Sequence, residues 1–345
     1  MLIKRARIPV RQMLLIGFLP SFIKVFLYKI MGYKIGRASS IGFGSVIVGK
    51  DVILGSHVKI GFMTVVRAKS VEIGRYTRIG SMCFIDTEKV VIGEDTRINE
   101  NVIAAGIRFP NSLLKIGSRS IVMEYCYLNP SYPLEIGDDT GIGGHCLLFT
   151  HGSWSPITDG YPVTFAPIKL ADKVWLPWRV FVMPGVEIGE GSVIGANSLV
   201  SKNVPPHCLV AGSPAKIIKE DYPEKPDNEK LEKIVQMMVN EFKNHLCSHG
   251  YKVDLRKTDT DNGESIFRVT RKQAKYAMKL SAGVPSVDQS IDTYVCVSGS
   301  HFNVAGLSGN MIIGLYDRVR FGSTELGEEF VAFVSRYGMR FKRLD

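Results

Sequence analysis

The chain has 345 residues, of which 45% are hydrophobic and 10% are aromatic, so it is long enough to bury the cores of two domains. Its formal net charge of +10 comes from 43 basic and 33 acidic residues. The six cysteines show no CxxC or other metal-ligand spacing, and we recognise no secretory signal with a small-residue cleavage site. These features exclude a disulfide-stapled secreted domain and favour a globular protein of the reducing cytoplasm.

The first 34 residues combine positive charge with apolar runs. The first acidic residue is Asp51, whereas basic residues up to position 37 alternate with MLLIGFLP and IKVFLYKI. This segment is expected either to cap one end of a core or to contact anionic lipid as a basic amphipathic helix through residues 1–30, and the two roles are compatible. Pro20 and Lys24 interrupt the apolar stretch that a membrane span needs, and the basic residues offer no stacking platform for nucleic acid. The basic residues are Lys4, Arg5, Arg7, Arg11, Lys24, Lys29, Lys34 and Arg37.

A short repeat fills the middle of the chain. The dipeptide Ile-Gly starts at 11 positions between residues 35 and 194, and in four pairs the spacing is six residues. The stretch GVEIGEGSVIGANSLV shows the full pattern, with one aliphatic residue in every six. Spacings of 19 and 20 residues between repeats indicate that three hexapeptides form one coil.

This period predicts an all-β fold in which aliphatic side chains stack from coil to coil. We expect a parallel β-helix from Ile35 to about Val210, and its hexapeptide form is typical of the left-handed kind. Glycine and small residues at the corners should allow tight turns and close approach of the backbone. The N-terminal segment would close one end, and the stretch after Pro214 would leave the other.

The repeat breaks most clearly between Phe149 and Val174, where THGSWSPITDGYPVTFAPIKLADK contains three prolines and no hexapeptide. A long loop that leaves a rigid scaffold is a usual place for a functional site, and His151 stands at the start of this loop. His145 lies six residues earlier, so the repeat would place it at an equivalent position on a different face. A surface histidine without a chemical role is the alternative for both.

From IGDDTGIGGHCLLFTHGSW through DKVWLPWRVFVMPGVEIGEGSVIGANSLVSKNVPPHCLVAGSPAKIIK, the sequence resembles the hexapeptide-repeat acyltransferases. This group contains galactoside, maltose, xenobiotic and capsule or colanic-acid type O-acetyltransferases. The resemblance covers about residues 35–219, and the tail DKVW…PGVEIG…VPP…AGSPAK is its most specific part. It implies a homotrimer that binds acetyl-CoA in a groove between neighbouring β-helices and uses one loop histidine as general base.

Carried over by position, the general base is His151. A neutral imidazole can take the proton of a sugar hydroxyl as the oxygen attacks the thioester, while backbone amides stabilise the oxyanion. Many members place an asparagine about one and a half coils earlier. Here that stretch reads MEYCYLNP, in which Glu124 is expected to orient His151 or contact the sugar, unless it is a solvated strand residue. The metal site of the carbonic anhydrases with this fold needs three histidines at a subunit boundary, and because only His57 and His207 are left in this region, no metal is expected.

The resemblance also implies cofactor contacts near the end of the repeats. The usual small residues after the family's tryptophan are replaced by Pro177-Trp178-Arg179, so Trp178 would line or alter the pantetheine path and Arg179 would pair with a phosphate. Lysine suits a phosphate because it is a compact charge, although solvated lysines at a domain edge are the alternative. The further candidates are Ala196, Ser201, Lys202, Lys216 and Lys219.

Past Lys219 the repeat ends and DYPEKPDNEK is typical of a linker. Apolar residues then recur at helical spacing and predict one amphipathic helix up to about His249. The β-rich runs YKVDLR, SIFRVT, TYVCVSG and MIIGLYDRVRF follow, and EEFVAFVSRYGMRF is a helix or a strand. We therefore expect a cap over residues 1–34, a β-helix over 35–219 and a small α+β accessory domain of unknown role over 220–345.

Together these features predict an acetyl-CoA-dependent O-acetyltransferase that acts on a sugar hydroxyl of a surface polysaccharide or its nucleotide- or lipid-linked precursor. It would work as a homotrimer in the cytoplasm or on the inner face of the membrane. Two alternatives remain: an N-acyltransferase that modifies an amino sugar with the same base and cofactor, and a catalytically silent β-helix that serves as a binding scaffold.

Overall fold

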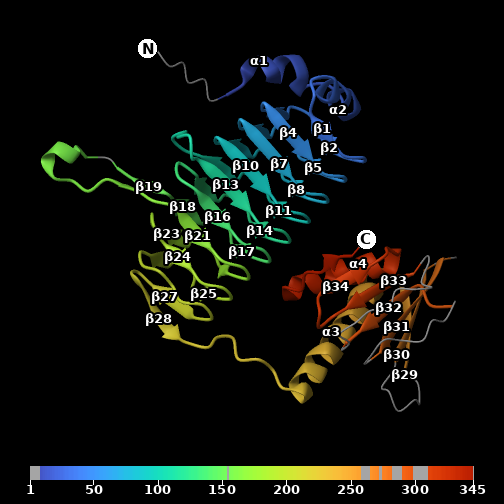
Figure 1. The fold of residues 1–345 in the computed structure, drawn as a ribbon. Coiled ribbons are helices and arrows are strands. Elements are labelled where there is room, and N and C mark those ends of the chain that lie inside the picture. Colours follow the sequence, from blue (N-terminus) through green and yellow to red (C-terminus); the bar gives the residue numbers. More distant parts are fainter. Residues whose placement is uncertain are drawn as a thin grey trace. The chain divides into compact units, whose positions relative to one another are not determined.

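The structure is a computed structural model that describes residues 8–153, 155–257, 265–271, 274–281, 290–297 and 310–344. The chain forms two compact units, one up to residue 224 and one from residue 225 on, and each is described by itself (Figure 1). Parts of the segments named in the sequence analysis lie outside the described residues: positions 1–7 with the basic residues Lys4, Arg5 and Arg7, Trp154 of the irregular stretch, and positions 298 and 299 of TYVCVSG.

The first unit is built from three parallel sheets that the chain visits in turn (Figure 1). The first sheet contains β1 (Lys34–Ile35), β4 (Asp51–Leu54), β7 (Ser70–Ile73), β10 (Lys89–Ile92), β13 (Leu113–Ile116), β16 (Leu134–Ile136), β21 (Ile168–Leu170) and β24 (Glu187–Ile188). The second contains β2 (Ser40–Ile41), β5 (Lys59–Ile60), β8 (Arg78–Ile79), β11 (Arg97–Ile98), β14 (Ile121–Val122), β17 (Gly141–Ile142), β22 (Trp175–Leu176), β25 (Val193–Ile194), β27 (Leu209–Gly212) and β28 (Ala215–Lys219). The third contains β3 (Val46–Val48), β6 (Val65–Arg67), β9 (Phe84–Asp86), β12 (Ile103–Ala105), β15 (Tyr127–Asn129), β18 (Leu147–Phe149), β23 (Phe181–Val182) and β26 (Leu199–Val200).

Each strand pairs in parallel with its counterpart in the coils before and after it, and only β28 folds back antiparallel on β27. The register stacks the inward residue of one coil on that of the next, as where Ile92 pairs with Ile73 and with Ile116. These side chains are almost fully buried in one continuous core. Parallel β-structure built from hexapeptide repeats is therefore confirmed.

The three corners of the coil differ in how much their length varies. From the first sheet to the second, and from the second to the third, the inward residues are always six apart, as in Ile73, Ile79 and Ile85. The corner from the third sheet back to the first absorbs every insertion. It holds residues 106–112 between β12 and β13 and residues 150–167 between β18 and β21.

The glycines of the Ile-Gly pairs allow close approach between coils. A Cβ added to Gly74 would lie 2.6 Å from the backbone nitrogen of Glu94 in the next coil, a distance that real Cβ atoms do not reach. The left-handed turn itself falls two residues later, on residues such as His57 (φ 60°) and Tyr76 (φ 61°). The expectation that glycine supplies the tight turn is thus wrong at these corners, where glycine supplies room and other residues bear the positive φ.

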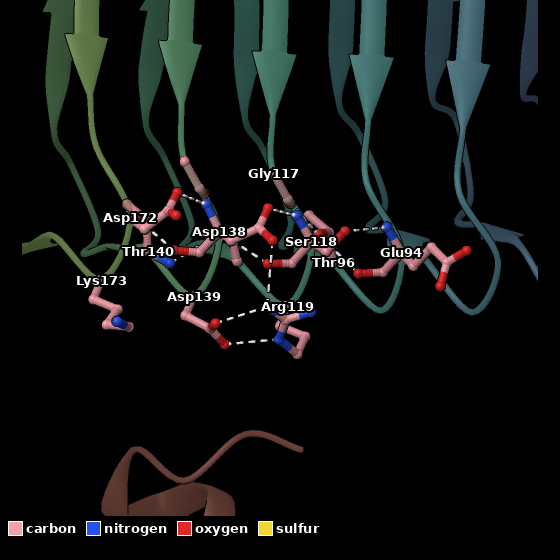
Figure 2. Close-up of polar contacts among 12 residues, drawn as sticks. Glu94, Thr96, Gly117, Ser118, Arg119, Asp138, Asp139, Thr140, Asp172 and Lys173 are labelled. Atoms are coloured by element: carbon pink, nitrogen blue, oxygen red, sulfur yellow. Dashed lines mark hydrogen bonds and ion pairs between the residues drawn. The ribbon is translucent and has the colours of Figure 1, made fainter. Parts of the chain in front are cut away.

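A ladder of polar side chains follows the corner between the first and second sheets (Figure 2). The side chain of Asp172 accepts a hydrogen bond from the backbone N–H of Asp138 at 2.8 Å, and Asp138 accepts one from the N–H of Ser118 at 2.8 Å. The Ser118 hydroxyl in turn accepts from the N–H of Glu94 at 3.1 Å, and Arg119 pairs with Asp138 at 3.3 Å. These contacts satisfy backbone donors at the corner, where strand pairing is interrupted.

Short helices close the N-terminal end of the β-helix (Figure 1). They are α1 (Val10–Gln12), the π-helical turn η1 (Met13–Gly17) and α2 (Ser21–Ile30). Side chains of α2 satisfy backbone donors of the first coil. The N–H of Ile41 donates to the Ser21 hydroxyl at 2.9 Å, and the N–H of Ile47 donates to the Tyr28 hydroxyl at 3.0 Å. The helix therefore substitutes for the missing preceding coil.

Lys24 is part of this closure. Its ammonium group donates to the backbone oxygens of Gly42 at 2.6 Å and Ser45 at 3.0 Å, and the residue is fully buried. Burial lowers the pKa of Lys24 to about 8. Lys24 was grouped with the other basic residues of a segment expected to cap a core or to contact lipid. Its charge points into the protein, so among these basic residues Lys24 is not available to lipid.

Within the described residues, no single helix has both the length and the apolar content needed to cross a membrane. The segments Val10–Gly17 and Ser21–Ile30 meet that criterion only when they are taken together, and they are bent by 117° relative to each other.

The second unit contains a seven-stranded mixed sheet with α3 (Asn228–Ser248), α4 (Glu325–Val334) and the turn η3 (Ser335–Tyr337). Buried aromatic residues of the two helices, Phe242 and Phe330, share one core with Phe267 of the strand β30. The helix expected up to His249 matches α3, whereas Ala274–Ser281 forms a long strand that the sequence analysis did not predict. The strands in spatial order are β29 (Lys252–Lys257), β30 (Ser265–Arg271), β31 (Ala274–Ser281), β32 (Thr293–Cys296), β33 (Met311–Gly314), β34 (Val319–Phe321) and β35 (Lys342–Arg343).

The buried ammonium group gives a first prediction. Replacing Lys24 by Met should lower the free energy of unfolding by about 1–3 kcal/mol, because buried carbonyl oxygens lose their donor. Lys29→Met changes an exposed lysine of the same helix and should leave stability nearly unchanged. The folded-state pKa lies below the ordinary value of 10.5, so the unfolded chain binds more protons between these two pH values. Wild-type stability should therefore rise relative to Lys24→Met from pH 8 to pH 10.5 in denaturant titrations, and equal effects of the two substitutions would contradict the assignment.

Candidate active site

The two insertions at the variable corner form the candidate site. In the longer one, β19 (His151–Gly152) pairs antiparallel with β20 (Thr164–Phe165), and the turn η2 (Ile157–Asp159) lies between them. The regular coil resumes at β21, which begins at Ile168. The irregular segment is therefore shorter than the stretch up to Val174 that the sequence suggested.

His151 is held from one side by two buried polar residues at the end of β15. Its Nδ1 lies 3.2 Å from the Oδ1 of Asn129 and 3.4 Å from the hydroxyl of Ser131. Asn129 is 2% exposed and Ser131 is fully buried. Both partners therefore sit on the rigid coil, and only the histidine belongs to the excursion.

The hydrogen bonds of Asn129 decide which nitrogen of His151 carries the proton. The backbone N–H of Ser131 donates to the Asn129 Oδ1 at 3.2 Å, and the Ser131 hydroxyl donates to the same oxygen at 2.7 Å. The amide oxygen of Asn129 therefore faces the ring, and a carbonyl oxygen can only accept. The Nδ1 of His151 must then carry the hydrogen, which leaves the lone pair of the neutral ring on Nε2.

The shorter insertion, residues 106–112, also contacts the hydrogen-bond network of Asn129 and Ser131. The backbone N–H of Ile107 donates to the Ser131 hydroxyl at 2.9 Å. Gly106 gives the network its room, since an added Cβ would lie 2.4 Å from the Ser131 Oγ and 2.5 Å from the Asn129 Oδ1. The two insertions are thus parts of one site, although 44 residues of sequence separate Gly106 from the start of the second insertion at Thr150.

Aromatic rings cover the other side of the histidine. The ring of Phe165 stacks on His151 with centroids 5.6 Å apart and an angle of 11°. Phe109 packs edge-on against Phe165 and against Tyr132, at 5.6 Å and 5.7 Å. Burial lowers the pKa of His151 below its ordinary value of 6.5, so the ring is neutral at neutral pH.

Glu124 lies at another corner and does not orient His151. Its carboxylate accepts a hydrogen bond from the Asn99 side chain at 2.9 Å, and within the described residues no hydrogen bond joins it to His151. The residues that take this place are Asn129 and Ser131. The stretch MEYCYLNP already contains Asn129, and a polar residue at the buried end of an apolar strand was the available signal.

His145 lies at the opposite end of β18 from His151. It occupies the corner between the second and third sheets, where its ring stacks on Tyr125 at 5.2 Å and contacts Trp178 at 5.7 Å. The two histidines therefore belong to different corners of the coil. Within the described residues, no group of three or more His, Cys, Asp or Glu side chains is arranged to hold a metal ion.

The candidate cofactor residues fall into three groups. Trp178, Arg179 and Ala196 are exposed on consecutive coils at the same corner as His145, and the N–H of Asn197 donates to the Trp178 carbonyl at 3.1 Å. This group is continuous on the surface. Sheet three separates it from the corner that carries His151.

The remaining candidates lie nearer the C-terminal end of the β-helix. Ser201 and Lys202 are exposed after β26 at the variable corner, while Lys216 and Lys219 are exposed on β28 at the edge of the second sheet. A groove of about 460 Å³ lies beside the strands β21 and β24 and residues 203–206. Its lining includes Lys169, Glu187, Asn203 and Pro205. A single chain thus does not gather all the predicted cofactor residues in one place.

No family model matches the chain, but individual known proteins are similar to parts of it. A candidate acetyltransferase of Schizosaccharomyces pombe is 56% identical over 54 residues, 16% of this chain and 26% of that protein. One of Staphylococcus aureus is 43% identical over 76 residues, 22% of this chain and 35% of that protein. The chain thus spans about a quarter to a third of the length of these two relatives.

Longer matches exist to a sequence and to solved structures. The candidate colanic acid biosynthesis acetyltransferase WcaF of Escherichia coli is 30% identical over 125 residues, 31% of this chain and 69% of WcaF. The structure of the polySia specific acetyltransferase NeuO matches with a TM-score of 0.35 and 22% identity over 62% of this chain and 99% of that one. The acetyl-CoA complex of a hexapeptide-repeat acetyltransferase from Vibrio cholerae gives 0.28 and 20% over 62% and 85%. At these TM-scores the structural matches carry no argument.

The repeat, the three stacked sheets and the loop histidine define a hexapeptide-repeat protein with a single polar site on its irregular corner. The match to WcaF covers more than two thirds of that protein. The chain belongs to the hexapeptide-repeat acetyltransferases, in the family that includes WcaF.

The tautomer of His151 is directly measurable. In ¹⁵N-labelled protein, Nδ1 should be protonated and Nε2 unprotonated in the neutral ring, and the titration midpoint should lie below pH 6.5. Gly106→Ala should displace Asn129 or Ser131 and give mixed tautomers of the neutral ring. Gly152→Ala is the matched control, because an added Cβ there meets nothing within 4 Å. A wild-type ring protonated mainly on Nε2 would contradict the network.

Proposed function

We propose that this protein is an acetyl-CoA-dependent O-acetyltransferase that modifies a sugar hydroxyl of a surface polysaccharide or of its precursor. The observation that carries the proposal is the fixed Nδ1–H of His151 against Asn129, which leaves Nε2 free as a base. Membership of the WcaF family supports acetyl transfer. The name of WcaF, which refers to colanic acid, supports a polysaccharide acceptor.

The proposed reaction uses His151 twice. As the sugar oxygen attacks the thioester carbonyl, Nε2 takes the hydroxyl proton, and a tetrahedral oxyanion forms. The carbon–sulfur bond then breaks, and the imidazolium returns the proton to the leaving CoA thiolate. The products are the O-acetyl sugar and CoA with a free thiol, and His151 is regenerated in its starting state. Asn129 accepts from Nδ1–H throughout and stabilises the transient positive charge of the ring.

The environment of His151 suits a base that works near neutral pH. Because burial lowers its pKa, the unprotonated form that can accept a proton predominates at neutral pH. The stacked Phe165 and the buried Asn129 and Ser131 fix the ring plane, so little reorientation is needed when the acceptor binds. Glu124 has no step in this scheme.

We also propose that the coils wind left-handed and that three chains assemble. The corner with Trp178, Arg179 and Ala196 and the corner with His151 lie on either side of the third sheet, so one chain does not bring them together. A neighbouring copy could place its own Trp178 corner opposite His151, and acetyl-CoA would then lie in the groove between the copies. In this arrangement Arg179 and the exposed lysines 202, 216 and 219 are available to the phosphates of CoA.

The cytoplasm is the proposed compartment. All six cysteines are free thiols, and Cys83, Cys126, Cys146 and Cys208 are buried in the β-helix as small apolar residues. The acyl donor proposed here is a cytoplasmic metabolite. The acceptor would accordingly be a nucleotide-linked or lipid-linked precursor that is present on that side of the membrane.

The base is tested by substitutions of two histidines. His151→Ala should lower kcat by about 10²–10⁴-fold, the usual contribution of a general base, while the fold is kept. His57→Ala is the matched control and should leave kcat within a few-fold, because His57 lies at the corner between the first and second sheets, away from both corners of the proposed groove. Release of free thiol from acetyl-CoA in the presence of host glycan fractions gives the rate, and analysis of the product distinguishes an ester on a hydroxyl from an amide on an amino sugar. Undiminished turnover by His151→Ala, or no turnover with any glycan, would contradict the proposal.

Cofactor binding is tested without any acceptor. Acetyl-CoA should raise the melting temperature of the wild-type protein, because a ligand that binds only the folded state stabilises it by mass action. Arg179→Ala and Lys216→Ala should each weaken this shift by several-fold in apparent Kd. Lys173→Ala removes an exposed lysine of the same coil as Arg179, at the corner with the polar ladder, and should have no such effect. Equal shifts for all three variants would place the cofactor elsewhere.

A further inference from the structure

The N-terminal closure has two opposite faces. The face toward the first coil carries Lys24 and Tyr28, which are buried. The opposite face of α2 carries Phe22, Phe26 and Ile30, whose exposed fractions are 75%, 62% and 68%. Residues spaced by four lie on one side of a helix, so these three form a continuous apolar stripe.

The segment before α2 also exposes large apolar side chains. Leu14, Leu15 and Phe18 are also exposed, and the ring of Phe18 packs edge-on against Phe43 at 5.2 Å. We call these six residues, Leu14, Leu15, Phe18, Phe22, Phe26 and Ile30, the apolar end face. Large apolar residues scattered singly need no explanation, whereas a cluster of this size marks an interaction surface.

The charges around the apolar end face have one sign. Arg11, Lys29, Lys34 and Arg37 are exposed, and no acidic residue precedes Asp51 in the chain. Lys24, the one basic residue of α2 on the other side, donates to two backbone carbonyl oxygens and does not reach the surface. An apolar stripe with basic residues beside it matches the interface of an anionic bilayer, where the rings enter the acyl boundary and the cations meet headgroups.

We propose that the apolar end face docks the protein on an anionic membrane surface, with the end of the β-helix against the lipid. A two-fold contact with a second copy through the same face would bring four basic residues against their own kind, and such contacts between like charges are unfavourable. Lipid headgroups supply the opposite charge. The charge of the apolar end face therefore favours a phospholipid partner. The experiment must distinguish lipid binding from self-association.

Docking at this end fixes how far the candidate site lies from the lipid. In the third sheet, β18, which leads into His151, is five strands away from β3 in the first coil. At about 4.8 Å per strand this separation is roughly 24 Å. If the proposed acyl transfer is correct, a membrane-bound acceptor must hold the reacting sugar several residues out from its lipid. Docking itself does not depend on the acyl transfer.

The test is co-sedimentation of the full chain with vesicles. Wild-type protein should bind vesicles of equimolar phosphatidylcholine and phosphatidylglycerol, bind pure phosphatidylcholine weakly, and lose binding as salt is raised. Phe22→Ala combined with Phe26→Ala should lower the partition coefficient by about tenfold or more, since two large side chains no longer leave water. Met237→Ala removes a half-exposed apolar residue of α3 and should change nothing.

Three further readouts keep the outcomes distinct. Circular dichroism melts should show that the double variant folds, and thiol release with a soluble glycan should match the wild type, so that loss of vesicle binding is separate from loss of catalysis. Sedimentation of the lipid-free protein should give the same oligomer for both forms. Absent wild-type binding to anionic vesicles, full binding by the double variant, or a smaller oligomer of the double variant would overturn the proposal.

Discussion

The fold depends on the register between successive coils. Each inward aliphatic residue must lie on its counterpart in the coil before, and each strand must present its N–H and C=O groups to both neighbours. A coil that shifted by one residue would turn its aliphatic side chains outward and its polar ones inward. Two corners obey this constraint with a constant length of six residues. The third corner is free to vary because the chain can leave and return at the same two points.

The candidate site uses this division between constant and variable corners. Asn129 and Ser131 follow a strand whose position is fixed by pairing on both sides, whereas His151 belongs to an excursion that β19 and β20 close on themselves. The regular coil therefore sets the tautomer and orientation of a ring that the excursion supplies. The ring contacts of Phe165 with Phe109 and with His151 join the two insertions. The excursion is therefore held in place beside His151.

The sequence predicted those parts of the molecule that repeat. Ile73, Ile79 and their equivalents recur at a fixed period, and a period of six with one aliphatic residue has few other solutions. His151 was identified because it stands where the period fails. Contacts between residues that no period relates were not predictable in this way. Lys24 carries the same charge as Lys29 and Lys34, which are near it in the sequence. It differs from them because its ammonium group binds carbonyl oxygens of the first coil.

The hydrogen-bond partner of His151 was also not predictable from the sequence period. Glu124 and Asn129 stand five residues apart in one short stretch, and a carboxylate is the more obvious group to orient an imidazole. The corner between β14 and β15 turns Glu124 toward Asn99, while the strand β15 carries Asn129 to the site. The left-handed residues such as Tyr76 were missed for a related reason. Their backbone N–H groups donate to carbonyl oxygens of the preceding coil, as from Tyr76 to Ser56, and a contact between coils is not visible in the local sequence.

The uneven corners also bear on how such a chain can change. An extra residue between the first and second sheets would shift the register of the strands that follow it, so it would disrupt the packing of the whole core. Extra residues at the corner of His151 leave the column untouched, however many there are. New segments can therefore be inserted beside the imidazole without changing the path of the chain through the scaffold. Within one lineage, this corner is the position at which the sequence can change to fit different acceptors.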